Sequence, residues 1–216
     1  MIISYKKQVT ILITAILLFV NITNLFSQVE QKDIIYYSLE DAMVAPESVY
    51  QLNLFYNRLT ELDTVIGQMI NLQVLYLMRN SLKELPSEIG NLTELHTLKL
   101  DNNKLRNLPP EITKLTKLQS LYISNNQLKA LPEDIGKLQN LEKLLLTDNQ
   151  LQAIPSSIGQ LTNLKLLNLS NNYLTSLPKE ITNLKNLETL ILTDNSIDSE
   201  TKKMIKEQMP DTKVIW

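Results

Sequence analysis

Residues 72–94 read LQVLYLMRNSLKELPSEIGNLTE, and variants of this stretch recur along the chain with a period of 23 residues. One asparagine returns in every copy, and the resulting ladder comprises Asn57, Asn80, Asn103, Asn126, Asn149, Asn172 and Asn195. A strict period of this length is typical of stacked repeat proteins, in which each copy buries its apolar face against its neighbours. The period therefore predicts an elongated stack that forms one domain.

Each copy also carries a fixed set of apolar positions. In residues 72–94 these are Leu72, Leu75, Leu77, Leu82, Leu85, Ile89 and Leu92. The segment LxLxx alternates apolar and polar residues, which is the period of a strand with one buried face. The asparagine follows where the strand must turn, and its amide can bond backbone groups of its own and adjacent copies. The next segment, PxxIxxL, favours a short helical turn with proline at its first position.

The consensus LxxLxLxxNxLxxLPxxIxxLxx resembles the 23-residue leucine-rich repeat, and it is similar to the Ras-group subclass and to bacterial proteins with the same LPxxIxxL segment. The resemblance covers residues 49–197, as six full repeats and one partial repeat. It implies an α/β fold, a leucine-rich repeat solenoid with a curved parallel sheet on the concave side and short helical turns on the convex side.

Both ends depart from the repeat pattern. Residues 28–48 are expected to form a linker and a capping helix over SLEDAMVA, which Ser38 caps and Pro46 ends. Residues 198–216 are expected to form a C-terminal cap, made of an amphipathic helix and a KVIW tail that covers the last core layer. Caps of this kind keep the end of the core out of water.

The first 27 residues have the composition of a secretory signal peptide. Lys6 and Lys7 precede an apolar stretch over residues 9–20, and cleavage is expected after Ser27. The alternative is an uncleaved membrane anchor, but polar residues interrupt the apolar run, and a full span needs about 20 apolar residues. Either way, we expect the repeats to be exported to the periplasm, the cell surface or the medium.

The composition of the chain narrows the choice of partners. There is no cysteine, so the fold must be held by burial alone, without disulfides or thiol chemistry. The formal charge is −2, and it becomes −4 without the two lysines of the signal segment. A mildly acidic chain without a basic block gives no reason to expect nucleic acid or anionic lipid as a partner. Membrane contact is expected only if the signal segment is not cleaved.

No residue pattern predicts catalysis, a cofactor or a metal. The chain has a single histidine, His96, which we interpret as a surface residue. Asp and Asn do gather before the ladder asparagines, as in Asp148 and Asp194, and a cation-binding stripe is one interpretation. These residue types also favour turns, and two strands that lie two copies apart are separated by about 10 Å, which is too far for direct ligation of one calcium ion.

Aromatic residues gather at the strand positions that should face outward on the concave side, mainly in the first two copies. The candidate partner-binding residues are Tyr50, Phe55, Tyr56, Tyr76, Arg79 and Tyr122. Tyrosine and arginine are enriched in binding hot spots, although strands favour tyrosine without any function.

The sequence therefore predicts a non-enzymatic module that binds a protein on its concave face. The alternative is a carbohydrate or cell-wall glycan binder that uses the concave tyrosines as stacking platforms.

Overall fold

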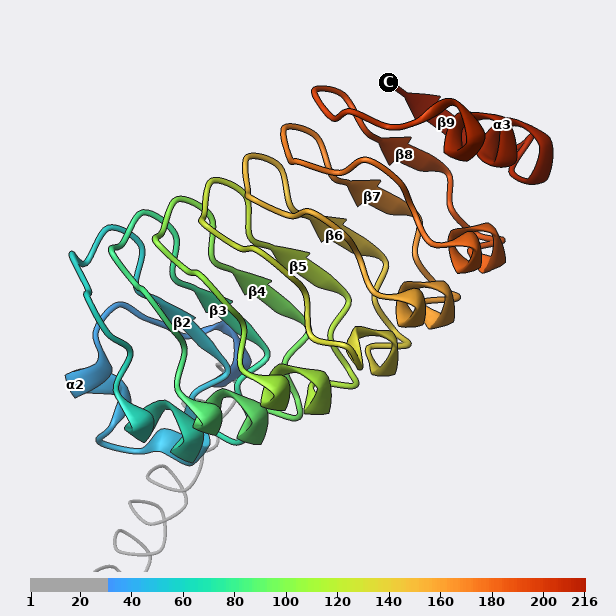
Figure 1. Ribbon diagram of the computed structural model, residues 1–216. Helices are drawn as coiled ribbons and strands as arrows, with labels where there is room; N and C mark the ends of the chain where they lie inside the picture. The colour runs from blue at the N-terminus through green and yellow to red at the C-terminus, as the bar shows by residue number, and fades with distance from the viewer. Residues whose placement is uncertain (1–30) are drawn as a thin grey trace, which may run out of the picture.

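The computed structural model describes residues 31–216, and the expected signal segment lies outside the described residues. Within that range one parallel sheet contains nine short strands in chain order (Figure 1). They are β1 (Ile35–Tyr36), β2 (Gln51–Asn53), β3 (Val74–Tyr76), β4 (Thr97–Lys99), β5 (Ser120–Tyr122), β6 (Lys143–Leu145), β7 (Leu166–Asn168), β8 (Thr189–Ile191) and β9 (Lys213–Ile215). The predicted leucine-rich repeat solenoid is confirmed.

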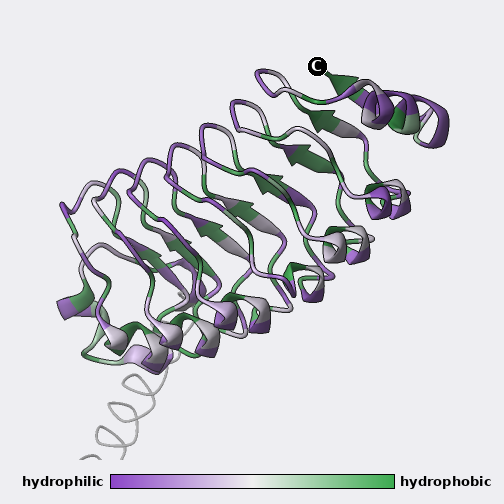
Figure 2. Cartoon of the chain, in the orientation of Figure 1, coloured by the Kyte–Doolittle hydropathy of each residue, from purple (hydrophilic) through white to green (hydrophobic). Residues whose placement is uncertain are grey.

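The strand register matches the sequence period, because equivalent leucines lie side by side. Leu75 of β3 pairs with Leu98 of β4, which pairs with Leu121 of β5, and all three are fully buried. Each strand thus points one leucine inward and two flanking side chains outward. Hydrophobic and hydrophilic residues alternate along every coil of the chain, as Figure 2 shows. The inward leucines form one continuous core along the stack.

The opposite wall consists of short 3₁₀ turns. They are η3 (Thr64–Gln68), η4 (Ser87–Asn91), η5 (Pro110–Lys114), η6 (Ile135–Lys137), η7 (Ser156–Gln160) and η8 (Lys179–Asn183), whereas η1 (Gln31–Asp33) and η2 (Pro46–Ser48) directly precede β1 and β2. The expectation that the repeat proline occupies the first helical position is wrong for η5, η7 and η8, where the proline immediately precedes the turn, and likewise for η4. Pro86 precedes that turn with an extended ψ of 152°. Its ring restricts φ, so it fixes the direction in which the chain enters the turn.

Glycine marks the places where neighbouring turns approach most closely. A Cβ atom on Gly159 would lie 2.3 Å from the carbonyl oxygen of Glu180 in the next copy, and one on Gly136 would lie 2.3 Å from that of Ser157. Each glycine is therefore required by packing between copies, since any side chain would force the two backbones apart.

Both ends of the sheet are covered by elements outside the repeat pattern. At the N-terminus, α2 (Leu39–Ala42) is capped by Ser38, whose hydroxyl accepts from the Asp41 amide at 3.1 Å. Strand β1, which the sequence did not lead us to expect, adds to the sheet before α2. At the C-terminus, α3 (Ser199–Gln208) buries Ile205 completely, and β9 pairs with β8. Half-buried Val214 covers the core, whereas Trp216 is exposed.

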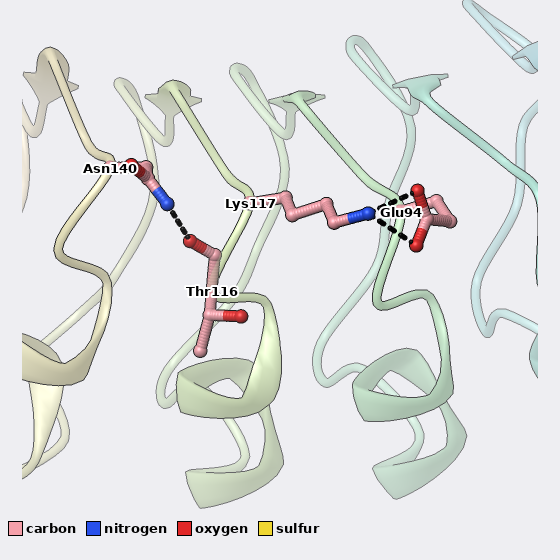
Figure 3. A network of polar contacts seen from close by, with 4 residues as sticks. All are labelled: Glu94, Thr116, Lys117 and Asn140. Atoms are coloured by element: carbon pink, nitrogen blue, oxygen red, sulfur yellow. Dashed lines mark hydrogen bonds and ion pairs between the residues drawn. The ribbon is translucent and has the colours of Figure 1, made fainter.

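Polar side chains also link successive copies at the segments that follow the 3₁₀ turns (Figure 3). The Lys117 ammonium lies 2.6 Å from a carboxylate oxygen of Glu94, and the Asn140 amide donates to the carbonyl oxygen of Thr116 at 2.7 Å. These groups are largely exposed, so we expect each contact to contribute about 1 kcal/mol or less to stability.

Candidate binding face

On the outward face of the strands, one lysine side chain lies between two tyrosine rings. Tyr76, Lys99 and Tyr122 occupy the same register position of β3, β4 and β5. The Lys99 ammonium nitrogen lies 5.0 Å from the ring centroid of Tyr76 and 5.0 Å from that of Tyr122. Both distances permit cation–π attraction, so the two rings hold the ammonium group between them. We call these three residues the strand-face cluster.

A carboxylate and small side chains surround the strand-face cluster. Asp101 follows β4 and accepts a hydrogen bond from the Ser124 amide at 2.9 Å. Partial burial raises the pKa of the Asp101 carboxyl above its ordinary value, and this hydrogen bond offsets the increase only in part. On the other side, Thr97 and Ser120 are the outward residues at the beginnings of β4 and β5. Both residues are small, and the tyrosines Tyr76 and Tyr122 are half-buried.

Phe55, Tyr56 and Arg79 form a separate group on the loops that leave β2 and β3. The ring centroids of Phe55 and Tyr56 are 6.2 Å apart, and the Arg79 guanidinium carbon lies 5.8 Å from the Phe55 centroid. The prediction that these residues belong to strands is wrong, because β2 ends at Asn53 and β3 ends at Tyr76. Tyr56 and Arg79 instead adopt positive φ angles of 57° and 55°.

Tyr50 lies in a third place, immediately before β2. The Lys32 ammonium nitrogen is 6.0 Å from its ring centroid, so the N-terminal segment approaches this tyrosine. The six predicted residues thus divide among the strand face, the departing loops and the N-terminal edge. Only Tyr76 and Tyr122 among them are strand residues.

The family of the chain follows from its repeats. Residues 56–129 and 121–209 match the family model of the leucine-rich repeat region. The chain belongs to the leucine-rich repeat family. No match was found among curated proteins.

Two solved structures resemble this leucine-rich repeat protein. One is a leucine-rich repeat protein of Leptospira interrogans, at 34% identity and a TM-score of 0.62, with 85% of this chain and 58% of that chain covered. The other is the leucine-rich repeat ectodomain of the membrane receptor kinase GASSHO1/SCHENGEN3 from Arabidopsis thaliana, in complex with CASPARIAN STRIP INTEGRITY FACTOR 2. It is 35% identical with a TM-score of 0.64, and 69% of this chain and 19% of that chain are covered. The leucine-rich repeat protein therefore spans less than two thirds of each.

Sequence reasoning missed the role of Lys99 because a single lysine on a strand belongs to no motif. The available signal was the period, since Lys99 lies 23 residues from both Tyr76 and Tyr122. The interpretation of His96 as a surface residue is also incomplete. Its side chain is half-buried, and its Nδ1 atom is buried without a hydrogen-bond partner.

The remaining chemistry of the leucine-rich repeat protein is sparse. Residues 31–216 contain no group of three or more His, Cys, Asp or Glu side chains placed to hold a metal ion. Among the Asp and Asn residues that precede the ladder asparagines, Asp148 accepts a hydrogen bond from the Asn171 side-chain amide. Over the same described range, no helix has the length and apolar composition to cross a membrane.

Proposed function

We propose that this leucine-rich repeat protein is an exported, non-enzymatic module that binds a partner protein on the concave face of its sheet. The observation that carries the proposal is the strand-face cluster, in which Lys99 lies 5.0 Å from two tyrosine rings on adjacent strands. Tyrosines at such a position supply a large contact area, and a hot spot of this kind is typical of protein interfaces.

Rigidity supports the same proposal. The three side chains lie on consecutive strands of one hydrogen-bonded sheet, and the cation–π contacts limit their freedom before any partner arrives. A preordered surface loses little conformational entropy on binding, so more of the contact energy appears as affinity. The similar plant ectodomain, in its complex with CASPARIAN STRIP INTEGRITY FACTOR 2, provides a precedent for partner binding by this fold.

The glycan alternative receives less support from this geometry. A sugar stacks on the open face of an aromatic ring, whereas Lys99 lies over the rings of both Tyr76 and Tyr122. A protein carboxylate, in contrast, would pair directly with the ammonium group held between them. We therefore favour a protein partner for the strand-face cluster.

Affinity capture from envelope and culture fluid, with the chain as bait, would supply partners for a titration. Tyr76→Ala and Tyr122→Ala are each expected to weaken binding about thirtyfold, the effect of truncating a central hot-spot tyrosine. Tyr173→Ala is the matched control, because Tyr173 is exposed on a loop of a later repeat. Equal losses in Tyr173→Ala and Tyr76→Ala would refute the strand-face cluster as the contact site. Binding to a glycan array that depends on Tyr76 would favour the alternative.

A further inference from the structure

The loops that leave β2 and β3 enclose a cationic hollow outside the strand-face cluster. The volume of this hollow is ≈ 450 Å³. Six residues line it: Tyr56, Arg58, Arg79, Asn80, Ser81 and Asn102. Two arginines from adjacent repeats thus share one small space, and the exposed Phe55 ring lies beside Arg79.

Neither arginine is neutralised by a neighbouring carboxylate. The ion pairs found between residues 31 and 216 involve only lysines: Lys117 with Glu94, Lys137 with Asp134, Lys165 with Glu142 and Lys203 with Glu207. Arg58 and Arg79 are both exposed. The planar guanidinium group presents five donors in a geometry that matches a carboxylate, so two such groups in one hollow favour an anion.

Three residues that line the hollow have a backbone conformation that is energetically unfavourable for their residue types. Tyr56, Arg58 and Arg79 have φ angles of 57°, 58° and 55°. In the later repeats, the position of Tyr56 and Arg79 is held by residues that tolerate this conformation: Asn102, Asn125, Asp148, Asn171 and Asp194. Asparagine at the positions of Tyr56 and Arg79 would therefore make the fold more stable. Strained residues of this kind persist at ligand-binding sites.

We propose that this hollow is a binding subsite for a side-chain carboxylate in an extended, acidic segment of a partner protein. Arg58 and Arg79 would pair with the carboxylate, while the Phe55 and Tyr56 rings would contact the neighbouring part of the segment. A protein segment suits the hollow better than a polyanion does. The whole chain carries a net charge of −2, which repels a long polyanion or an anionic membrane more strongly than a short segment with a few carboxylates. The subsite is independent of the strand-face cluster.

Fluorescence anisotropy with the full chain tests the proposal directly. The probe is a fluorescein-labelled octapeptide of alternating glutamate and glycine, and its counterpart carries glutamine in place of glutamate. We expect the glutamate peptide to bind at least about tenfold more tightly, as for a charge-assisted hydrogen bond. Arg58→Gln and Arg79→Gln should each weaken its binding by about tenfold on the same grounds. Arg106→Gln, on a later loop, removes an equal charge outside the hollow and should change binding less than about twofold.

Arg79→Asn separates loss of the subsite from loss of the fold. Asparagine tolerates a positive φ, so this variant should unfold at a higher urea concentration than the natural chain while it binds the peptide as weakly as Arg79→Gln does. Tyr76→Ala should weaken peptide binding less than Arg79→Gln does, which distinguishes failure of the subsite from failure of the proposed strand-face contact.

Three results would overturn the proposal. They are equal binding of the glutamate and glutamine peptides, an equal loss in Arg106→Gln and Arg79→Gln, and tighter binding of inorganic phosphate or phosphatidylserine vesicles than of the peptide.

Discussion

The side-chain amide of Asn126 donates a hydrogen bond of 3.0 Å to the carbonyl oxygen of Leu100, which lies 26 residues earlier in the previous repeat. The same amide also reaches the carbonyl oxygen of Ile123 in its own repeat at 3.3 Å, and its oxygen accepts from the Leu105 amide at 3.0 Å. One buried side chain therefore satisfies backbone groups of two consecutive repeats. Because the arrangement recurs at the other buried ladder asparagines, the stability of each repeat depends on its neighbour.

Asn126→Ala should be strongly destabilising. Alanine leaves the buried Leu105 amide without its partner and removes one of the two donors to the carbonyl oxygens of Leu100 and Ile123, and an unsatisfied buried group costs about 1–3 kcal/mol. We expect a loss of about 3 kcal/mol in the free energy of urea unfolding. Asn140→Ala is the control, since that exposed asparagine makes a single bond to the carbonyl oxygen of Thr116. Equal losses in the two variants would contradict the role assigned to the ladder.

Gly159→Ala should loosen the contact between two neighbouring 3₁₀ turns. The added methyl group would lie 2.3 Å from the Glu180 carbonyl oxygen, so the backbones must separate. Overpacking of this kind costs about 1–3 kcal/mol, which thermal unfolding can measure. Thr182→Ala is the control, because Thr182 occupies the same repeat position as Gly159 and already bears a side chain. This substitution should cost about 0.5–1 kcal/mol of stability through its lost hydrogen bond. A Gly159→Ala variant as stable as the natural protein would show that the turns can separate freely.

Asp101→Asn should stabilise the protein at neutral pH. Burial raises the pKa of the Asp101 carboxyl above its ordinary value of 3.8, so the folded protein binds this proton more tightly than the unfolded chain does. The resulting contribution to stability is complete below pH 3.8 and is lost as the pH rises through the raised pKa. Asparagine keeps an oxygen for the Ser124 amide but is never charged. Its advantage in urea unfolding should therefore shrink as the pH falls toward 3.8, and a variant less stable than the natural protein at pH 7 would contradict this account.

Removal of residues 199–216 should expose the last layer of the core. Strand β9 pairs with β8, and Ile205 of helix α3 and the following Met209 are buried in the core, so truncation uncovers the edge of β8 and its Leu190. An unprotected strand edge above an apolar layer favours aggregation. Light scattering should show soluble aggregates of the truncated chain at concentrations where the full chain remains monodisperse. Removal of Trp216 alone should have little effect because its side chain is exposed, and an unchanged melting temperature after full truncation would refute the cap.

The sequence alone predicted the register of the sheet and the roles of the recurring residues. Leu75, Leu98 and Leu121 are equivalent in a strict 23-residue period, so neighbouring copies could pair only with these leucines side by side. The polar character of the ladder asparagines, placed where each strand turns, likewise indicated that their amides satisfy the loop backbone. A period identifies equivalent residues because every copy must satisfy the same local requirements.

Only the tertiary structure decided which side chains meet. The backbones of Tyr56 and Arg79 still bond the next copy, but their positive φ angles turn the chain after β2 and β3 and take both side chains off the strand face. The contact of Lys99 with Tyr76 and Tyr122 depends on the spacing between stacked strands and on the rotamers of three outward side chains. The residues at outward positions vary from copy to copy because packing does not constrain them, so the repeat pattern shows which of them lie in line but not which side chains come into contact.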